Sequence, residues 1–209
     1  MTAKPADPPI DCHKCPRLTA FRKANKYAHP DWHNAPVPSF GAHTCTLLIV
    51  GLAPGLQGAN RTGRPFTGDY AGDLLYTTLI KFGWAKGNYD RRYDDGLRLN
   101  GCRITNAVRC VPPQNKPTSA EKNDCLPFLC NEIQGLPKLK TILALGRIAH
   151  DAVLASLAVK KSDYPFIHGS KYFLPNGLIL TDSYHCSRYN LNTRRLTKEM
   201  FEAVFFSLR

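Results

Sequence analysis

The chain has 209 residues, 43% of them hydrophobic, which is enough for one α/β domain with a substantial core and leaves little room for two. Its 28 Lys and Arg against 16 Asp and Glu give a net charge of +12, which fits a polyanionic partner such as nucleic acid and equally a basic soluble protein. No apolar run approaches the roughly 18 residues of a membrane span, and residues 1–11 are polar rather than signal-like, so we expect an intracellular protein, cytoplasmic or nucleoid-associated, without a membrane partner.

Four short apolar runs, rich in β-branched residues or leucine, are predicted strands. They are residues 47–50, 103–108, 141–145 and 178–182. Helices are predicted between and after them, at residues 69–82, from the capping box Thr118-Ser-Ala-Glu121 onward, at 146–157 and at 197–208. Strands and helices in alternation imply right-handed βαβ units, and therefore an α/β domain with a mostly parallel sheet flanked by helices. Residues 89–100, rich in Arg, Asp and Gly, are predicted to form an exposed excursion.

A glycine-rich loop, residues 51–69, directly follows the first predicted strand. Because glycine removes the side chain from a contact, this loop predicts a place where the backbone approaches a ligand closely. Polar residues also follow the second and fourth strands, at Thr105 and Asn106 and at residues 183–196. The carboxyl ends of parallel strands gather at one edge, so we expect these segments to line one crevice.

A polar crevice on a basic protein suits a base flipped out of DNA and held by stacking and hydrogen bonds. The Asn106 amide can offer a donor and an acceptor to one base edge, or it can simply tie the strand end to a loop.

Eight cysteines in a chain without a signal sequence favour metal binding or free thiols over disulfides. Cys12 and Cys15 form a CxxC pair, and Cys110 and Cys125 follow far downstream with fourteen residues between them. A quartet of this kind suits an iron–sulfur cluster or a structural zinc ion, and the spacing does not choose between them. The remaining cysteines are expected to be small buried apolar side chains, with Cys130 a rival to Cys125 as a ligand.

Several motifs stand in a fixed order along the chain. They are Gly51-Leu-Ala-Pro54, Asn60-Arg-Thr-Gly-Arg64 with Pro65-Phe-Thr-Gly-Asp69, Thr105-Asn-Ala-Val-Arg-Cys110 with Asn115-Lys-Pro-Thr118, and Ser183-Tyr-His185 with Ser187-Arg188 and residues 193–197. Together they resemble the motifs of family 5 uracil-DNA glycosylases, the type B group. The resemblance implies a single three-layer α/β/α domain over residues 1–209, with a central four-stranded parallel sheet. It also implies an N-terminal iron–sulfur-binding segment and a structural [4Fe-4S] cluster on Cys12, Cys15, Cys110 and Cys125.

The activity that this resemblance implies is excision of uracil from double-stranded DNA by hydrolysis of the N-glycosidic bond, which leaves an abasic site in base-excision repair. Other deaminated bases such as hypoxanthine are implied as further substrates, and no diffusible cofactor is required. Related families carry an acidic or amide side chain where this loop has Leu52 and Ala53. Placement of the water then falls to Asp69, with Asp73 as the fallback carboxylate. Asp69 also fits a helix N-cap, where backbone donors are expected to lower its pKa.

The resemblance also assigns the remaining pocket residues. Phe66 is the aromatic on which the flipped base stacks, and Asn106 is the amide that reads its edge. Gly51 and Ala53 lie against the base. His185 donates a hydrogen bond to the base O2 as negative charge develops on the departing ring.

Six residues are expected to contact DNA: Arg61, Arg64, Arg188, Tyr189, Leu191 and Arg194. Arg61 and Arg64 either hold phosphates or pair with nearby acids, and Tyr189 or Leu191 fills the gap that the flipped nucleotide leaves. Arg194 stands where the family pattern has a glycine, which puts the path of that loop in doubt.

We expect a monomer. The main alternative function is a non-catalytic iron–sulfur or zinc DNA-binding module, which would bind uracil-containing DNA without releasing the base. A nucleotide-binding α/β enzyme fits less well, because the chain lacks the GxxxxGK[ST] order of a phosphate-binding loop.

Overall fold

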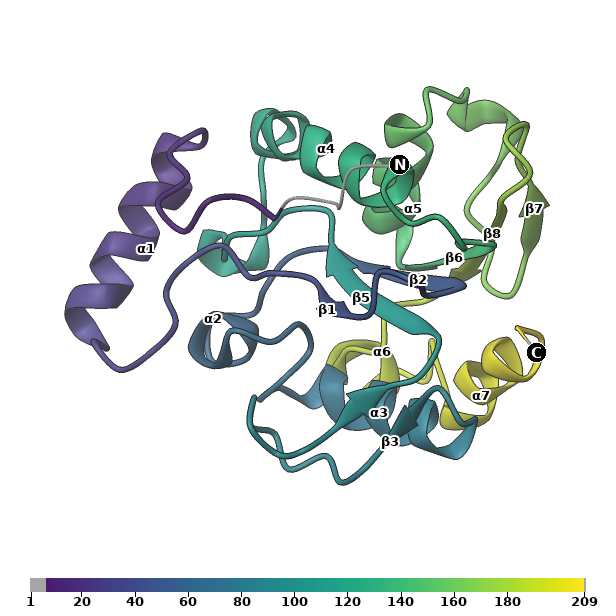
Figure 1. Ribbon diagram of the computed structural model, residues 1–209, viewed down its shortest axis with the longest axis horizontal. Coiled ribbons are helices and arrows are strands. Elements are labelled where there is room, and N and C mark those ends of the chain that lie inside the picture. The colour runs from purple at the N-terminus through teal and green to yellow at the C-terminus, as the bar shows by residue number, and fades with distance from the viewer. Residues whose placement is uncertain (1–6, 209) are drawn as a thin grey trace.

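The computed structural model describes residues 7–208, so residues 1–6 and 209 of the predicted domain lie outside the description. A six-stranded sheet with the order β1-β5-β2-β6-β8-β7 forms the middle layer (Figure 1). Its four central strands are parallel: β2 (Leu47–Gly51), β5 (Cys102–Asn106), β6 (Thr141–Leu145) and β8 (Ile179–Ser183). The α/β class is confirmed.

The predicted number of strands is wrong, because the sheet has six strands rather than four. Two antiparallel strands extend its edges, β1 (Phe40–Gly41) beside β5 and β7 (Lys171–Phe173) beside β8. Each is only two or three residues long and only partly buried, so neither produces the apolar run by which a strand is recognised.

The central strands are buried on both faces, as expected for a parallel sheet between helix layers. In β2, Leu47 and Ile49 join an apolar cluster on one face, while Leu48 and Val50 join a second cluster on the other. The first face is covered by α3 (Tyr70–Lys81) and α7 (Lys198–Phe206), and the second by α4 (Ser119–Gln134) and α5 (Arg147–Ser156).

Helix starts follow the predicted capping chemistry. The Thr118 hydroxyl accepts from the Glu121 N–H at 3.2 Å, and the Glu121 carboxylate accepts from the Thr118 N–H at 2.8 Å, so the capping box of α4 is present. The remaining elements were not predicted. They are α1 (Pro16–Ala28), α2 (Ala59–Thr62), α6 (Arg188–Asn192), the 3₁₀ turns η1 (Pro113–Asn115) and η2 (Lys161–Asp163), and a hairpin of β3 (Ala85–Lys86) and β4 (Arg98–Leu99).

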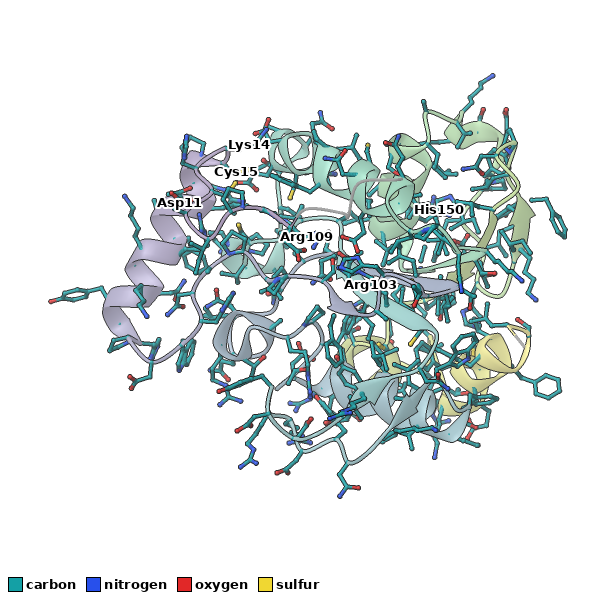
Figure 2. The ribbon with its side chains drawn as sticks, in the orientation of Figure 1. Asp11, Lys14, Cys15, Arg103, Arg109 and His150 are labelled. Atoms are coloured by element: carbon teal, nitrogen blue, oxygen red, sulfur yellow. The ribbon has the colours of Figure 1, made fainter. Side chains whose placement is uncertain are left out.

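Buried ion pairs fasten α4 to β5. The Glu132 carboxylate, fully buried on α4, accepts from the guanidinium groups of Arg103 and Arg109, the second at 3.1 Å. The two arginines are labelled in Figure 2. Since Arg109 directly precedes Cys110 and Glu132 shares a helix with Cys125, this network fixes the two downstream cysteines relative to each other. Over residues 7–208, no helix is long and apolar enough to cross a membrane.

Candidate active site

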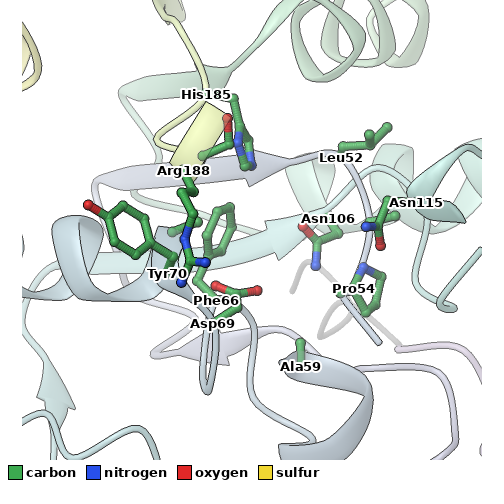
Figure 3. A pocket seen from close by; sticks show the side chains of 14 residues that line it. Leu52, Pro54, Ala59, Phe66, Asp69, Tyr70, Asn106, Asn115, His185 and Arg188 are labelled. Atoms are coloured by element: carbon green, nitrogen blue, oxygen red, sulfur yellow. The ribbon is translucent and has the colours of Figure 1, made fainter. Parts of the chain in front are cut away.

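A cavity of about 300 Å³ opens at the carboxyl ends of β2, β5 and β8 (Figure 3). The three segments that were expected to converge all contribute side chains to it. Its lining includes Leu52, Ala53, Phe66, Asp69, Asn106 and His185. Most of the predicted pocket residues are therefore in one place, and Gly51 lies just beneath them.

Gly51 leaves room for two lining side chains to stand next to each other. A Cβ atom at this position would lie 2.4 Å from Asn106 Oδ1 and 2.6 Å from Phe66 Cζ. The segments that follow β2 and β5 stay paired beyond the sheet. The N–H groups of Ala107 and Val108 donate to the carbonyls of Gly51 and Leu52, both at 2.9 Å. The absence of a side chain at residue 51 thus lets the Asn106 amide and the Phe66 ring share the cavity floor.

Gly51→Ala is expected to slow base release from uracil-containing duplex at least tenfold, because its methyl group must push Asn106 or Phe66 out of place and a misplacement of ~1 Å costs roughly 10²-fold in rate. Single-turnover assays with thermal melting measure the effect. Gly177→Ala is the control for a loss of stability away from the cavity, because its Cβ meets open space while its φ of +82° strains an alanine. A Gly51→Ala rate within twofold of wild type would contradict the close approach.

Phe66 occupies a backbone conformation that aromatic residues rarely adopt, with φ of +54°. Its buried ring lies 5.9 Å from the His185 ring, centroid to centroid, at an interplanar angle of 30°. A flat aromatic face beside an imidazole suits a planar ring held by stacking at one face and by a hydrogen bond at its edge.

Asp69 caps α3 and lines the cavity at the same time. Its Oδ1 accepts from the Gly72 N–H at 3.1 Å, while Oδ2 faces Gly58, where an added Cβ would lie 2.5 Å away. The predicted lowering of its pKa is wrong. Burial raises the pKa of Asp69 above its ordinary 3.8, and the backbone donors of Gly72 and Ala71 only oppose that rise.

His185 is held at the end of β8 by its backbone. The Asn190 side chain donates to the His185 carbonyl at 2.8 Å, so α6 is fastened to this residue. Burial lowers the pKa of His185 to about 4, which keeps the imidazole neutral near pH 7. A neutral ring can donate from one nitrogen to an acceptor in the cavity without bringing a full charge into it.

The cavity lining also includes Asn115, Tyr70 and Arg188, to which the sequence interpretation gave no role or a different one. Asn115 faces the cavity beside Asn106 and Pro54, and its φ is +57° (Figure 3). Tyr70 and Arg188 stand together at another side, with the guanidinium carbon 5.0 Å from the Tyr70 ring centroid. The Asn-Lys-Pro-Thr motif was the signal for Asn115, whereas nothing in the sequence singled out Tyr70.

The prediction that Arg64 contacts DNA is contradicted by its burial. The side chain is 4% exposed, and both terminal nitrogens donate to the Asp95 carboxylate at 2.8 and 2.7 Å. Three rings, those of Phe40, Tyr76 and Tyr89, surround the guanidinium group. The other reading of Arg64, pairing with a nearby acid, is the one the structure shows.

The other predicted DNA contacts differ in exposure. Arg61, Arg188 and Arg194 are exposed, and so is the Tyr189 side chain at 72%, whereas Leu191 packs against the apolar core. Arg194 adopts φ of +56°, a conformation that glycine takes without strain. Although Arg194 stands where the family pattern has a glycine, its backbone therefore keeps the conformation that a glycine would favour.

Cys12, Cys15, Cys110 and Cys125 line one small cavity between α1, α4 and the loop after β5, and Cys130 is not among its lining residues. Figure 2 places Cys15 near the start of α1. In the part of the chain that the structure describes, no group of three or more His, Cys, Asp or Glu side chains is arranged to hold a metal ion.

The donor chemistry of this cavity nevertheless fits an all-cysteine site. Burial raises the pKa of the Cys15 thiol to about 11 and that of Cys110 to about 12, so the metal-free thiols are protonated and must lose their protons to act as ligands. The Arg109 N–H donates to Cys125 Sγ at 3.3 Å, a contact that also suits a coordinated thiolate.

Comparison with known proteins gives one family. The profile of the Uracil DNA glycosylase superfamily matches residues 38–209. The chain is 46% identical over 204 residues to a type-5 uracil-DNA glycosylase of Thermus thermophilus, covering 95% of this chain and 92% of that protein. It is 36% identical over 199 residues to the type-5 enzyme of Pyrobaculum aerophilum, covering 93% and 86% of the two chains. A type-4 uracil-DNA glycosylase of the same organism is 34% identical over 163 residues, 78% of this chain and 69% of that protein. The chain belongs to the uracil-DNA glycosylase superfamily.

Proposed function

We propose that the protein is a monofunctional DNA glycosylase that flips uracil out of double-stranded DNA and hydrolyses its N-glycosidic bond, leaving an abasic site for base-excision repair. The observation that carries the proposal is the convergence of Phe66, Asp69, Asn106 and His185 in one cavity, in a chain similar to type-5 uracil-DNA glycosylases over nearly its whole length.

The chemistry follows from where these groups stand. The bond between C1′ and N1 breaks, its electron pair leaves with the uracil ring, and positive charge develops on the sugar. A neutral His185 donates a hydrogen bond to O2 of the departing anion. The Asp69 carboxylate stabilises the sugar cation and orients the water, whose oxygen bonds to C1′ and whose proton passes to Asp69 or to solvent. The Phe66 ring stacks on the base and the Asn106 amide reads its edge.

DNA reaches the cavity over a basic rim. Arg188 lies at the cavity itself, while Tyr189 and Arg194 are exposed on the same segment. Exposure favours Tyr189 over Leu191 as the residue that fills the space left by the flipped nucleotide, since Leu191 is engaged in the core. The enzyme acts as an intracellular monomer on DNA, and other deaminated bases such as hypoxanthine are further substrates.

The deciding experiment is release of free uracil from a duplex with one U·G pair, with a T·A duplex of the same sequence as the control. We expect release only from the uracil duplex, with the DNA strand left intact until alkali cleaves it at the abasic site. Binding of both duplexes without base release would overturn the proposal and favour the non-catalytic DNA-binding module.

The cysteine cavity is proposed to hold a structural [4Fe-4S] cluster on Cys12, Cys15, Cys110 and Cys125, a group that would fix the N-terminal segment to the loop after β5. Cys12→Ser is expected to lose the absorbance at roughly 400 nm and most of the iron, and to melt at a lower temperature. Cys130→Ser, on α4 but away from the cavity, is the matched control. Full iron content in purified Cys12→Ser would exclude the assignment of Cys12 as a ligand.

A further inference from the structure

The turn that places Phe66 and Asp69 at the cavity contains residues with positive φ angles, a conformation that side-chain-bearing residues rarely adopt. Phe66 has φ of +54° and Gly68 has φ of +92°. For a bulky aromatic residue the left-handed conformation is unfavourable, so it persists only where surrounding groups fix it. The fixing groups therefore determine where the Phe66 ring and the Asp69 carboxylate stand.

One hydroxyl group holds both ends of this turn. The Tyr89 hydroxyl donates to the Phe66 carbonyl at 3.2 Å and accepts from the Gly68 N–H at 3.3 Å. Burial raises the pKa of Tyr89 to about 12, so the hydroxyl keeps its proton and performs both functions near pH 7. Its ring packs on the Tyr76 ring, with centroids 4.5 Å apart.

The approach of this hydroxyl depends on a glycine in the first turn of α3. A Cβ atom at Gly72 would lie 2.4 Å from Tyr89 Oη and 1.8 Å from the Phe66 carbonyl oxygen. The same Gly72 N–H donates to Asp69. The contact of the Tyr89 hydroxyl, the turn at Phe66 and the Asp69 cap thus all depend on Gly72.

Tyr89 lies in the excursion between β3 and β4, and a buried ion pair holds this excursion in place. Asp95 of this excursion is nearly fully buried against Arg64, and its carboxylate also accepts from the N–H groups of Asp90 and Leu97 at 2.9 and 3.1 Å. A second ion pair, between Arg91 and Asp73, is more exposed to solvent and therefore contributes little to the stability of the excursion. The buried pair ties the excursion to the chain two residues before Phe66, so the excursion and the turn form one unit.

We propose that Tyr89 is a positioning residue, whose hydroxyl clamps the turn of residues 66–68 and so sets the stacking ring of Phe66 and the carboxylate of Asp69 in their working positions. The proposal rests on the proposed function for its effect on catalysis. The clamp itself is a property of the turn, which can be measured without substrate.

Tyr89→Phe keeps the ring and removes only the hydroxyl. Because a displacement of ~1 Å in a catalytic group can cost roughly 10²-fold, we expect the single-turnover rate of uracil release to fall about 10- to 100-fold, with the affinity for uracil-free duplex within about twofold of wild type. Tyr93→Phe makes the same chemical change in the same excursion on a side chain that is 72% exposed, and its rate should stay within about twofold of wild type. An unchanged rate in Tyr89→Phe would overturn the proposal.

A double-mutant cycle separates positioning from general destabilisation. Where the hydroxyl acts through the turn, Tyr89→Phe should slow a Phe66→Ala enzyme less than it slows wild type. Equal slowing in the wild-type, Phe66→Ala and Asp69→Asn backgrounds, together with a lower melting temperature, would mean that Tyr89 has only a structural role.

Hydrogen exchange gives a readout that does not depend on activity. The Gly68 N–H loses its acceptor in Tyr89→Phe and should exchange at least several-fold faster than in wild type, whereas the Tyr93→Phe protein should match wild type. Unchanged exchange would exclude the clamp. A wild-type enzyme that releases no uracil would instead refute the proposed function, while the Gly68 exchange rate would still decide whether Tyr89 holds the turn.

Discussion

Asp69→Asn is expected to slow uracil release by about 10²- to 10⁴-fold without unfolding the protein. Asparagine caps a helix about as well as aspartate, so the hydrogen bond from the Gly72 N–H to the side chain survives and only the negative charge is lost. Single-turnover rates on a U·G duplex, with thermal melting of the same samples, measure the two effects separately.

Asp73→Asn is the control for this substitution. Asp73 lies in the same first turn of α3, pairs with Arg91 and does not line the cavity, so its loss should change the rate less than about threefold. A large loss in Asp73→Asn with a small one in Asp69→Asn would transfer the catalytic role to the fallback carboxylate.

The charge on Asp69 also sets the expected pH dependence. In the proposed mechanism only the ionised Asp69 carboxylate stabilises the sugar cation, so activity should be present above its pKa and be lost as the pH falls through it. Because burial raises that pKa above 3.8, the loss begins at a higher pH than an exposed aspartate would give. His185, with its pKa lowered to about 4, titrates below neutrality and adds no change between pH 6 and 8. Asp69→Asn should lack the part of the acid limb that Asp69 causes and keep only a change near pH 4, where His185 becomes protonated.

His185→Ala is expected to reduce the rate by about 10²- to 10³-fold, the usual cost of removing one donor from developing negative charge. The imidazole is neutral and faces the cavity, so in the proposed mechanism its loss removes a hydrogen bond to the departing ring, while the exposed basic rim should still bind duplex. His29→Ala, an exposed histidine that does not line the cavity, is the control.

The leaving group distinguishes this role from a packing effect. A 5-fluorouracil anion carries its charge more readily than a uracil anion, so it needs less help from His185. The rate loss in His185→Ala should therefore be smaller for 5-fluorouracil than for uracil. Equal losses for the two bases would indicate that His185 shapes the cavity rather than stabilising the anion.

The parts of the fold that could be predicted are those whose signal is local. The strands β2 and β6 are nearly continuous apolar runs, and β5 and β8 carry β-branched residues among polar ones. The capping box at Thr118 and Glu121 is a pattern within four residues. The convergence of the segments after β2, β5 and β8 follows from the geometry of parallel sheets, which is why most of the cavity lining was expected. Edge strands of two or three residues carry no such pattern.

The parts that could not be predicted depend on partners far along the chain. Arg64 looks like an ordinary basic residue until Asp95, thirty-one positions later, pairs with it in the interior. The pKa of Asp69 was expected to fall because of the cap, but the surrounding chain buries the carboxylate and reverses the direction. Tyr89 lies in a segment whose composition indicates an exposed loop, and only the folded chain brings its hydroxyl to the turn of residues 66–68.

The hydrogen bonds that continue the β2–β5 pairing past the sheet, from the N–H groups of Ala107 and Val108 to the carbonyls of Gly51 and Leu52, build one wall of the cavity, which we expect to be stiffer than the wall facing it. This wall is backbone paired as in a β-ladder, so we expect it to open slowly, and it carries the buried Asn106 amide. The facing wall includes Tyr70 and Arg188, both exposed on helices that begin at the cavity. Bases of different size should meet the same hydrogen-bonding edge at the stiff wall, while the compliant wall adjusts to their bulk. Tolerance of a larger base would then be set by how far Arg188 and Tyr70 can swing, and a shorter side chain at either position should widen it.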